Sequence, residues 1–325
     1  MQKILVDLLQ SDSQISVIGT ARDGKEALSK IASLHPDVVT LDIEMPRMNG
    51  LTTVRKIMET NPLPVIMISA LAQREAQLTL KALEFGAVDY VPKPSGPISL
   101  NMNAVKTELI SKVKTAAAAN IRQVKPREVE AVAPSMAKSG DRVISIAAST
   151  GGPAAVAYVL RHIPEKTPPI LVVQHMQKGM TRLFAEGLNK ECKLKVKEAE
   201  EGDVVQEGLA LIAPGGFHME VTKNGKINLT TSPPVNYVRP SADVMMKSAA
   251  RTYASKNIGV ILTGMGADGA KGIEAIKKKG GATIAQDKKT CVVFGMPNAA
   301  IKTGCVDSVT PLECIPNEIM NACED

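Results

Sequence analysis

Hydrophobic and polar positions alternate along this chain in short blocks whose period changes between two and about 3.6 residues. Short apolar runs indicate buried strands, and apolar residues recurring every three or four positions indicate amphipathic helices. In the first 98 residues, the predicted strands are 15–21, 38–41, 65–68 and 90–91, and the predicted helices are 25–34, 51–59 and 73–85. Strands and helices in strict alternation predict an α/β domain.

The same alternation returns in the second half of the chain. Its predicted strands are 143–148, 170–173, 193–198, 210–213, 225–229 and 258–262, with 282–285 as the last one. Its predicted helices are 154–162, 182–188, 242–254 and 270–278. A second α/β domain with a parallel sheet is expected there.

A segment of different composition joins the two halves. Residues 105–119 have a helical pattern that ends in alanines, and residues 121–140 combine prolines, serines and charges as linkers do. A length of 325 residues suits two domains and a connector. We therefore expect domains at 1–98 and 141–325 with a linker at 99–140.

Composition narrows the classes of function. Aromatic residues make up 2% of the chain and Trp is absent, which argues against a nucleic-acid stacking platform. The net charge of +6 is mild, and no apolar run is long enough to span a membrane. The five cysteines are odd in number and lack C-x-x-C spacing, which indicates a reducing compartment and no metal knuckle. A cytoplasmic protein without nucleic-acid binding, membrane insertion or a catalytic cofactor is expected.

The sequence VISIAASTGGP at residues 143–153 predicts a buried strand, a tight glycine-rich turn and a helix with Pro153 in its first turn. This places Ser149 at the carboxyl end of a parallel strand, where open α/β sheets carry their chemistry and where free backbone N–H groups can bind an anion. Ser149 is thus a candidate nucleophile. The alternative interpretation is that Ser149 and Thr150 only cap the helix.

A serine nucleophile needs a base and an acid that orients the base. His175 ends a buried strand on the same edge as Ser149, and His218, which closes another strand-like segment, is the second candidate. Asp268 follows a strand and begins a helix, whose positive end favours an ionised carboxylate. Each of these residues also has a plain structural interpretation, as a hydrogen-bonded histidine or a helix cap.

A competing interpretation rests on the same turn. Gly264, Gly266 and Gly269 match the dinucleotide-binding spacing, with Asp287 after the next strand, and would predict an NAD-dependent enzyme. Against it, Asp268 would place a carboxylate in the loop that must hold a pyrophosphate.

In the first half, Asp42, Ser69 and Lys93 stand at three successive strand ends. This resembles the receiver domain of two-component response regulators, a flavodoxin-like fold. The resemblance implies that Asp42 accepts a phosphoryl group, that Ser69 senses it and that Lys93 contacts it.

One part of the receiver pattern is missing. A receiver begins with a central strand that ends in an acidic pair binding Mg²⁺, and this sequence begins with what matches the first helix. Asp42 alone is a poor Mg²⁺ site. We expect a sheet lacking its first strand, and Mg²⁺-dependent phosphorylation only if the acidic pair is restored. The sequence then either begins at an internal Met, which we favour, or encodes a receiver that cannot work.

The motifs ASTGGP, VVQHM, IAPGGFH, VRPSADV, VILTGMGADGAKG and CVVFGMP extend the resemblance over nearly the whole chain, to the chemotaxis response regulator protein-glutamate methylesterase / protein-glutamine glutaminase family. It implies a doubly wound, Rossmann-like catalytic domain that is covered by the receiver until phosphorylation. It further implies hydrolysis of glutamyl methyl esters, and deamidation of glutamines, on chemoreceptor helices, with a histidine kinase as phosphoryl donor.

For the site, the resemblance implies catalytic roles for Ser149, His175 and Asp268 and an oxyanion contact from the Met265 N–H. Thr150 and Arg239 are expected substrate contacts. A phosphorylation-controlled binding module without hydrolase activity stays open as the alternative.

Overall fold

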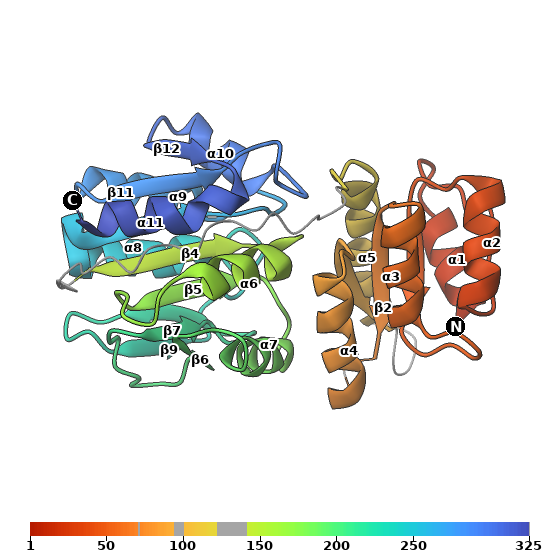
Figure 1. The fold of residues 1–325 in the computed structure, drawn as a ribbon, viewed down its shortest axis with the longest axis horizontal. Coiled ribbons are helices and arrows are strands. Elements are labelled where there is room, and N and C mark those ends of the chain that lie inside the picture. The colour runs from red at the N-terminus through yellow and green to blue at the C-terminus, as the bar shows by residue number, and fades with distance from the viewer. Residues whose placement is uncertain (71, 94–100, 122–141, 325) are drawn as a thin grey trace. The chain divides into compact units, whose positions relative to one another are not determined.

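The computed structural model describes residues 1–70, 72–93, 101–121 and 142–324 (Figure 1). The chain divides into two compact units, Met1–Lys125 and Pro126–Asp325. Each unit is built around its own sheet, and each is described below by itself. The α/β class predicted from the alternating pattern is confirmed for both.

The first unit holds a parallel sheet with the strand order β1-β2-β3 among its described residues. The strands are β1 (Val39–Asp42), β2 (Val65–Ser69) and β3 (Asp89–Pro92). The helices are α1 (Gln2–Gln10), α2 (Gly24–Leu34), α3 (Gly50–Thr60), α4 (Gln73–Glu84) and α5 (Asn101–Ala117). All five residues of β2 are buried, as expected for a strand with a neighbour on both edges.

The predicted strand at residues 15–21 is wrong, because these residues form no strand. A strand needs a partner for its backbone groups, and in the described sheet β1 pairs only with β2. A cavity of about 550 Å³ lies between β1 and residues 14–22, lined by apolar side chains such as Leu5, Leu9 and Leu41. Among the described residues, no strand therefore pairs with the other edge of β1.

Helix α5 extends the first unit beyond the predicted limit at residue 98. It packs against β3, where Lys112 donates to Asp89 (3.1 Å) and to the Tyr90 carbonyl (2.7 Å). These contacts place α5 in the first compact unit rather than in a connector. Residues 99–100 and 122–140 of the predicted linker lie outside the described residues, and the limits 1–98, 99–140 and 141–325 stay a prediction.

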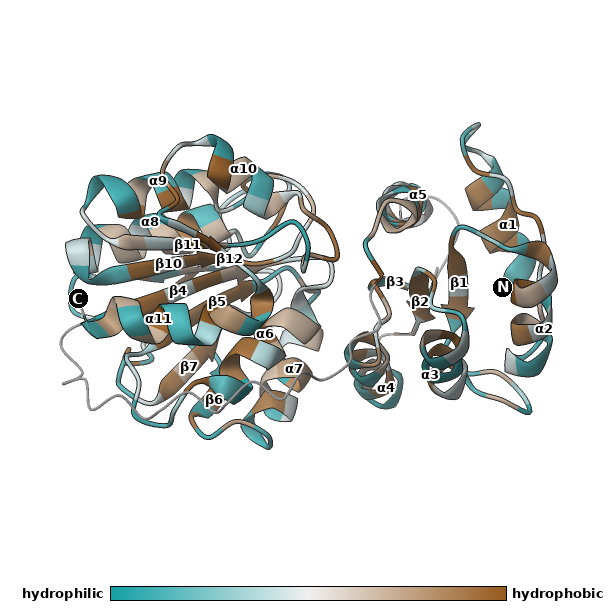
Figure 2. Ribbon diagram, turned by 45° about the horizontal axis from the view of Figure 1, so that its top comes forward, coloured by the Kyte–Doolittle hydropathy of each residue, from teal (hydrophilic) through white to brown (hydrophobic). Residues whose placement is uncertain are grey.

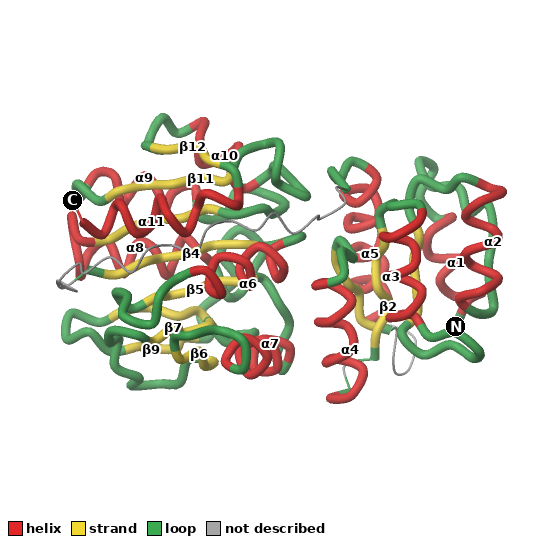
Figure 3. Tube along the Cα trace, viewed as in Figure 1, coloured by secondary structure: helices red, strands yellow, loops and turns green. Residues whose placement is uncertain are grey.

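The second unit is built on a parallel sheet with the strand order β12-β11-β10-β4-β5-β7-β6 (Figures 1 and 3). These strands are β4 (Val143–Ala148), β5 (Ile170–Gln174), β6 (Lys195–Glu198), β7 (Leu209–Ile212), β10 (Asn257–Ile261), β11 (Ala282–Gln286) and β12 (Ser308–Thr310). The chain starts at the centre with β4 and winds outward in both directions. This is the doubly wound arrangement that places a crevice at the carboxyl end of the central strands.

Helices cover both faces of this sheet (Figure 2). Those of one face are α8 (Ala242–Tyr253), α9 (Ala270–Lys278) and α10 (Met296–Lys302), and those of the other are α6 (Gly152–His162), α7 (Met180–Asn189) and α11 (Ile315–Glu324). Short 3₁₀ turns η1 (Ala254–Lys256) and η2 (Leu312–Cys314) precede β10 and α11. Figure 2 shows apolar residues along the central strands. They are fully buried there, as in β4, which explains why these strands read as continuous apolar runs.

Two details of the second unit differ from the sequence prediction. An antiparallel hairpin joins β8 (His218–Val221) and β9 (Ile227–Thr230), so His218 begins a strand rather than closing one. The strand at 282–285 is not the last, because β12 pairs with β11. The three residues of β12 are partly exposed, too short and too polar to give an apolar signal. In the described part of the chain, no helix is long and apolar enough to cross a membrane.

Candidate active site

Three neighbouring strands of the second unit end at one rim of the sheet. Ser149 follows β4, His175 follows β5, and the loop to Asp268 follows β10. Backbone hydrogen bonds tie these ends together, from the Ser149 N–H to the Thr263 carbonyl (3.0 Å) and from the His175 N–H to the Ala148 carbonyl (3.1 Å). The structure thus gathers the residues that the sequence placed at separate strand ends.

Two glycines beside Ser149 leave no room for a side chain, one in the turn that follows it and one in the facing loop after β10. A Cβ on Gly152 would lie 2.1 Å from the Gln174 amide oxygen, and a Cβ on Gly264 would lie 2.8 Å from the Ser149 Cβ. Gly151 has a φ of +73°, in the left-handed region that favours glycine. The Gln174 amide donates to the Ser149 carbonyl at 3.0 Å. Close packing on both sides therefore fixes the backbone that carries the serine.

His175 and Asp268 form a hydrogen-bonded pair. His175 Nε2 lies 2.9 Å from Asp268 Oδ2. An ionised carboxylate only accepts, so Nε2 carries the proton and Nδ1 is left as the acceptor of the neutral ring. Among the described side chains, no hydrogen bond joins the Ser149 hydroxyl to the imidazole. Such bonds are often long in a free enzyme and shorten when substrate binds.

Asp268 is 3% exposed and is surrounded by donors. Its Oδ1 accepts from the Ser241 hydroxyl (2.7 Å), the Asn236 amide (2.7 Å) and the Asp243 N–H (3.3 Å), and its Oδ2 also accepts from the Ala242 N–H (2.6 Å). Burial by itself would raise the pKa of Asp268, but the hydrogen bond and the charge of His175, with those from Ser241 and Asn236, lower it to about 2. The carboxylate is ionised and fixed at neutral pH.

The sequence interpretation missed the residues that hold Asp268. Ser241 and Asp243 belong to the start of α8, and Asn236 to the loop before it. The quoted motif VRPSADV contains two of them, but its polar positions look like an ordinary helix start. Their role depends on a contact between segments about thirty residues apart in sequence, of which the local pattern gives no sign.

His218, the second candidate for the base, is engaged elsewhere. It is 1% exposed, its Nδ1 accepts from the Ser241 N–H (3.1 Å), and its Nε2 lies 3.1 Å from the Pro233 carbonyl. With one ring nitrogen accepting and the other donating, no nitrogen is left for a serine. His218 instead supports the loop that leads to α8, from which Asn236 and Ser241 donate to Asp268.

The other predicted site residues lie around the same rim. Met265 is 44% exposed in the loop between β10 and α9, next to Gly264, whose carbonyl accepts from the Met296 N–H (2.8 Å). Thr150 is buried, and its carbonyl accepts from the Thr263 hydroxyl (3.0 Å). Arg239 donates from Nη1 to the carbonyls of Thr231 (2.7 Å) and Ser232 (2.9 Å). The guanidinium therefore stabilises the conformation of the loop that precedes α8.

The residues of the dinucleotide interpretation have other partners. The Gly269 N–H donates to Asp243 Oδ1 at 3.1 Å. Asp287 Oδ1 accepts from the N–H of Thr290 (2.9 Å) and from its hydroxyl, which closes a local turn. A pyrophosphate and a ribose would need these same groups, so the geometry does not favour a dinucleotide site.

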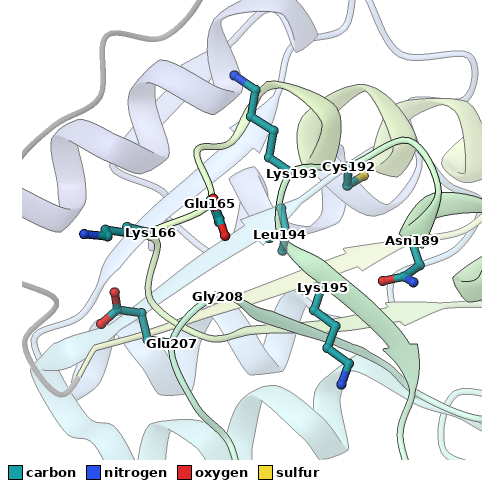
Figure 4. Close-up of a pocket in the computed structure, with 9 residues that line it drawn as sticks. All are labelled: Glu165, Lys166, Asn189, Cys192, Lys193, Leu194, Lys195, Glu207 and Gly208. Carbon is teal, nitrogen blue, oxygen red and sulfur yellow. The ribbon is translucent and has the colours of Figure 1, made fainter.

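A cavity of about 470 Å³ in the second unit lies away from these residues (Figure 4). It is lined by Glu165, Lys166, Asn189, Cys192, Lys193, Leu194, Lys195, Glu207 and Gly208. Lys195 begins β6, and Gly208 directly precedes β7. In a parallel sheet these amino ends face the edge opposite to Ser149, so this cavity is not the candidate active site.

In the first unit, Asp42 and Lys93, which stand at the ends of two strands, form an ion pair. Lys93 Nζ lies 2.8 Å from Asp42 Oδ1 and 3.5 Å from Glu75 Oε2. Burial alone would lower the pKa of Lys93, but the hydrogen bond and charge of Asp42, with the charge of Glu75, raise it. A charged lysine beside a strand-end carboxylate suits the handling of an anionic group.

Ser69 lies at the neighbouring strand end but is fully buried. Its hydroxyl donates to the Ala70 carbonyl (3.0 Å) and accepts from the Thr79 hydroxyl (2.7 Å). In the β1–β2 ladder Asp42 pairs with Ile68, so Ser69 lies one residue beyond the partner of Asp42, with its hydroxyl engaged toward α4.

The described residues do not fit a Mg²⁺ site at Asp42. Mg²⁺ takes oxygen ligands in octahedral geometry, often from more than one carboxylate. In the described ranges, no group of three or more His, Cys, Asp or Glu side chains could hold a metal. Lys93 occupies the oxygen of Asp42 that faces it.

Comparison with known proteins gives matches over both units. The family described as CheB methylesterase matches residues 144–319, and the family described as response regulator receiver domain matches residues 1–104. A protein-glutamate methylesterase/protein-glutamine glutaminase of Pyrococcus horikoshii is 51% identical over 336 residues, covering 100% of this chain and 91% of the relative. The protein of the same name from Symbiobacterium thermophilum is 46% identical, covering 99% and 94%.

A solved structure resembles the second unit. The catalytic domain of the CheB methylesterase from Thermotoga maritima is 45% identical, covers 56% of this chain and 98% of that domain, and superposes with a TM-score of 0.54. The similarity therefore includes nearly the whole of that domain.

Proposed function

The chain belongs to the CheB methylesterase family, and we propose that it hydrolyses glutamyl methyl esters, and deamidates glutamines, of chemoreceptors through a Ser149–His175–Asp268 triad. The observation that carries the assignment of the triad is the 2.9 Å contact between His175 and Asp268 on the rim where Ser149 ends β4. The family membership carries the assignment of the reaction.

The proposed reaction begins with attack of the Ser149 hydroxyl oxygen on the side-chain carbonyl of a methylated glutamate. His175 Nδ1 takes the hydroxyl proton, and the negative charge develops on the carbonyl oxygen. The bond to the methoxy group breaks, and the proton on Nδ1 passes to the leaving oxygen to give methanol. Water then cleaves the glutamyl-serine ester by the same sequence and yields the free carboxylate. With glutamine as substrate, the leaving group is ammonia.

Two groups support the developing charges. The buried Asp268 carboxylate holds the proton on Nε2 of His175 and stabilises the imidazolium that forms. We assign the Met265 N–H, in the adjoining loop, to the oxyanion, a contact worth about 3 kcal/mol in comparable enzymes.

Arg239 and Thr150 are the proposed substrate contacts. A guanidinium suits an acidic helix surface. Nη1 of Arg239 already donates to two loop carbonyls. Arg239 would therefore assist substrate binding in two ways, by holding the loop in place and by attracting the acidic surface with its positive charge. The proposed partners are the cytoplasmic helices of methyl-accepting chemoreceptors.

The receiver domain supplies the control. We propose that a chemotaxis histidine kinase donates a phosphoryl group to Asp42, that Lys93 then contacts the new anion, and that Ser69 reports its presence. The Asp42–Lys93 ion pair supports this, since the lysine already faces the acceptor oxygen. The Mg²⁺ that the receiver family implies would require acidic ligands beyond those described here. A cytoplasmic location is part of the same proposal.

Ser149→Ala tests the assignment of the nucleophile. Release of methanol from methylated receptor should fall by at least about 10⁴-fold, because alanine has no hydroxyl to attack the ester. Ser255→Ala, an exposed serine in η1 near the start of β10, is the matched control and should retain full activity. Circular dichroism should show both variants folded.

Unchanged methanol release in a folded Ser149→Ala variant would reject the triad. Absence of release by the unsubstituted protein, with binding to receptor retained, would favour the alternative of a binding module.

A further inference from the structure

A tight turn, Val235–Val238, stands next to the candidate triad. The N–H groups and carbonyls of Val235 and Val238 bond reciprocally at 3.2 and 3.1 Å. Both residues between them have positive φ, 53° for Asn236 and 65° for Tyr237. Asn tolerates the left-handed region because its side chain bonds locally, whereas a bulky aromatic residue there is unusual. Such backbone is retained where surrounding contacts require it.

The Asn236 side chain reaches from this turn to two buried carboxylates. Its Nδ2 lies 2.7 Å from Asp268 Oδ1 and 2.9 Å from Asp243 Oδ2. Asp268 is 3% exposed and Asp243 is 1% exposed. An amide nitrogen carries two hydrogens, one for each carboxylate.

The two anions need such a donor between them. The other oxygen of Asp243 accepts from the N–H groups of Gly269 (3.1 Å) and Gly272 (2.7 Å) at the start of α9. In the described part of the chain, the titratable side chains that contact Asp268 directly or through the Asn236 amide are His175 from the end of β5 and Asp243 from α8. Two carboxylates without a donor between them repel each other, so Asp268 would turn away from Asp243 and lose its direction toward His175.

The loop around the turn is itself fixed. Arg239 bonds the carbonyls of Thr231 and Ser232, and His218 bonds the Pro233 carbonyl and the Ser241 N–H. These contacts hold the loop on both sides of Asn236. The Asn236 amide therefore contacts Asp268 and Asp243 from a backbone that hydrogen bonds hold in place.

Building on the proposed function, we propose that Asn236 is a positioning residue, whose amide separates the carboxylates of Asp268 and Asp243 and keeps Oδ2 of Asp268 directed at His175. Asn236 touches neither substrate nor the reacting atoms, and it acts through Asp268. With the amide in place, the base keeps the tautomer that leaves Nδ1 free to accept the serine proton.

Substitutions at a left-handed position allow a clean test, because Asn, Gly and Asp all suit that backbone. Asn236→Gly removes the donor, and Asn236→Asp replaces it with a third acidic group. The matched control is Tyr237→Gly, which relieves the neighbouring left-handed position and leaves the amide in place.

Two readouts on the full chain are compared. The first is the tautomer of the neutral His175 ring, read by NMR at one pH from the nitrogen chemical shifts of Nδ1 and Nε2. The share of rings that carry the proton on Nδ1 should rise in Asn236→Gly and rise further in Asn236→Asp, because a displaced Asp268 Oδ2 no longer accepts from Nε2. The second is kcat for methanol release, which should fall by about tenfold in the Gly variant and further in the Asp variant.

Tyr237→Gly should leave the tautomer of His175 unchanged. The same tautomer with Asn, Gly and Asp at position 236 would overturn the positioning role, as would an equal change in Tyr237→Gly. The NMR readout does not require turnover. An inactive parent protein whose variants show a changed tautomer would therefore reject the hydrolase function alone, and an active parent whose variants keep the same tautomer would reject the role of Asn236 alone.

Discussion

The two units each place an aspartate at the end of a parallel strand or in the loop beyond it, and the two carboxylates have opposite surroundings. The Asp42 side chain is 29% exposed, and Lys93 at 2.8 Å is its side-chain partner. Asp268 is 3% exposed and accepts from His175, Ser241, Asn236 and two backbone N–H groups. In both units the edge of the sheet determines where the aspartate lies. The neighbouring loops determine how accessible its carboxylate oxygens are.

This difference suits two chemical roles. A carboxylate that accepts a phosphoryl group must be reached by the donor, so one of its oxygens has to remain approachable. A carboxylate that orients a histidine must stay ionised and stationary, which several donors ensure. Topology alone therefore does not distinguish a reactive aspartate from an orienting one.

Among the changes that test the contrast between the two carboxylates, the largest effect is expected for Asp268→Asn. An amide at this position can present its nitrogen to His175 and favour the wrong tautomer, so kcat for methanol release should fall by about 10³- to 10⁴-fold. Steady-state methanol release measures it.

Asp42→Asn is the matched control for that variant. Measured without a phosphoryl donor, it should keep the basal rate, because Asp42 belongs to the other unit. A loss of less than tenfold in Asp268→Asn would contradict the assigned role of the buried carboxylate.

The next effect concerns stability at acid pH. The pKa of Asp268 is about 2 in the folded protein against an ordinary value of 3.8. A lowered folded pKa contributes stability that is present above about pH 4 and is lost as the pH falls toward 2. The contribution amounts to about 2 kcal/mol.

Urea unfolding of the second unit at pH 6 and pH 3 measures this contribution. The free energy of unfolding should decline less between these pH values in Asp268→Asn than in the unsubstituted protein. Parallel declines would show that Asp268 is not the group responsible.

The smallest effect is expected for Lys93→Gln in the first unit. It removes a partly exposed ion pair with Asp42 and a longer one with Glu75. Such pairs contribute about 1 kcal/mol or less to stability. Denaturant unfolding followed in the first unit should show a loss of that size, with hydrolysis by the second unit unchanged in the absence of phosphorylation.

A loss several times larger for Lys93→Gln would mean that the Asp42 site is as tightly constrained as that of Asp268, and the contrast between the two carboxylates would fail. A matched control is Arg55→Gln, which removes the exposed pair with Glu59 on α3 and should change stability by less still.

Much of the fold could be predicted from local pattern. The apolar runs that became β4, β5 and β10 are buried on both faces and therefore read as strands without ambiguity. The prediction of a strand at residues 15–21 was wrong although the apolar pattern of these residues favours one, because a strand also needs a neighbouring strand to pair with. The short β12 escaped detection because its pairing with β11, rather than its apolar content, makes it a strand.

The candidate site was predictable in part for the same reason. Ser149, His175 and Asp268 each follow a recognisable strand or turn, so the rule that parallel strands carry chemistry at their carboxyl ends was sufficient to select them. The rule also selected His218 as a second base, and only its contacts with Ser241 and Pro233 removed it from that role.

The sequence by itself determined the class of fold, the strand ends that carry polar groups and, through its motifs, the family. Tertiary structure decided how these groups are used: that His175 pairs with Asp268, that Asn236 and Ser241 stabilise the carboxylate, and that Asp42 stays accessible beside Lys93. The physical reason is that periodicity records which face of an element is buried. The charge state and direction of a side chain depend instead on donors and acceptors from segments far away in the sequence.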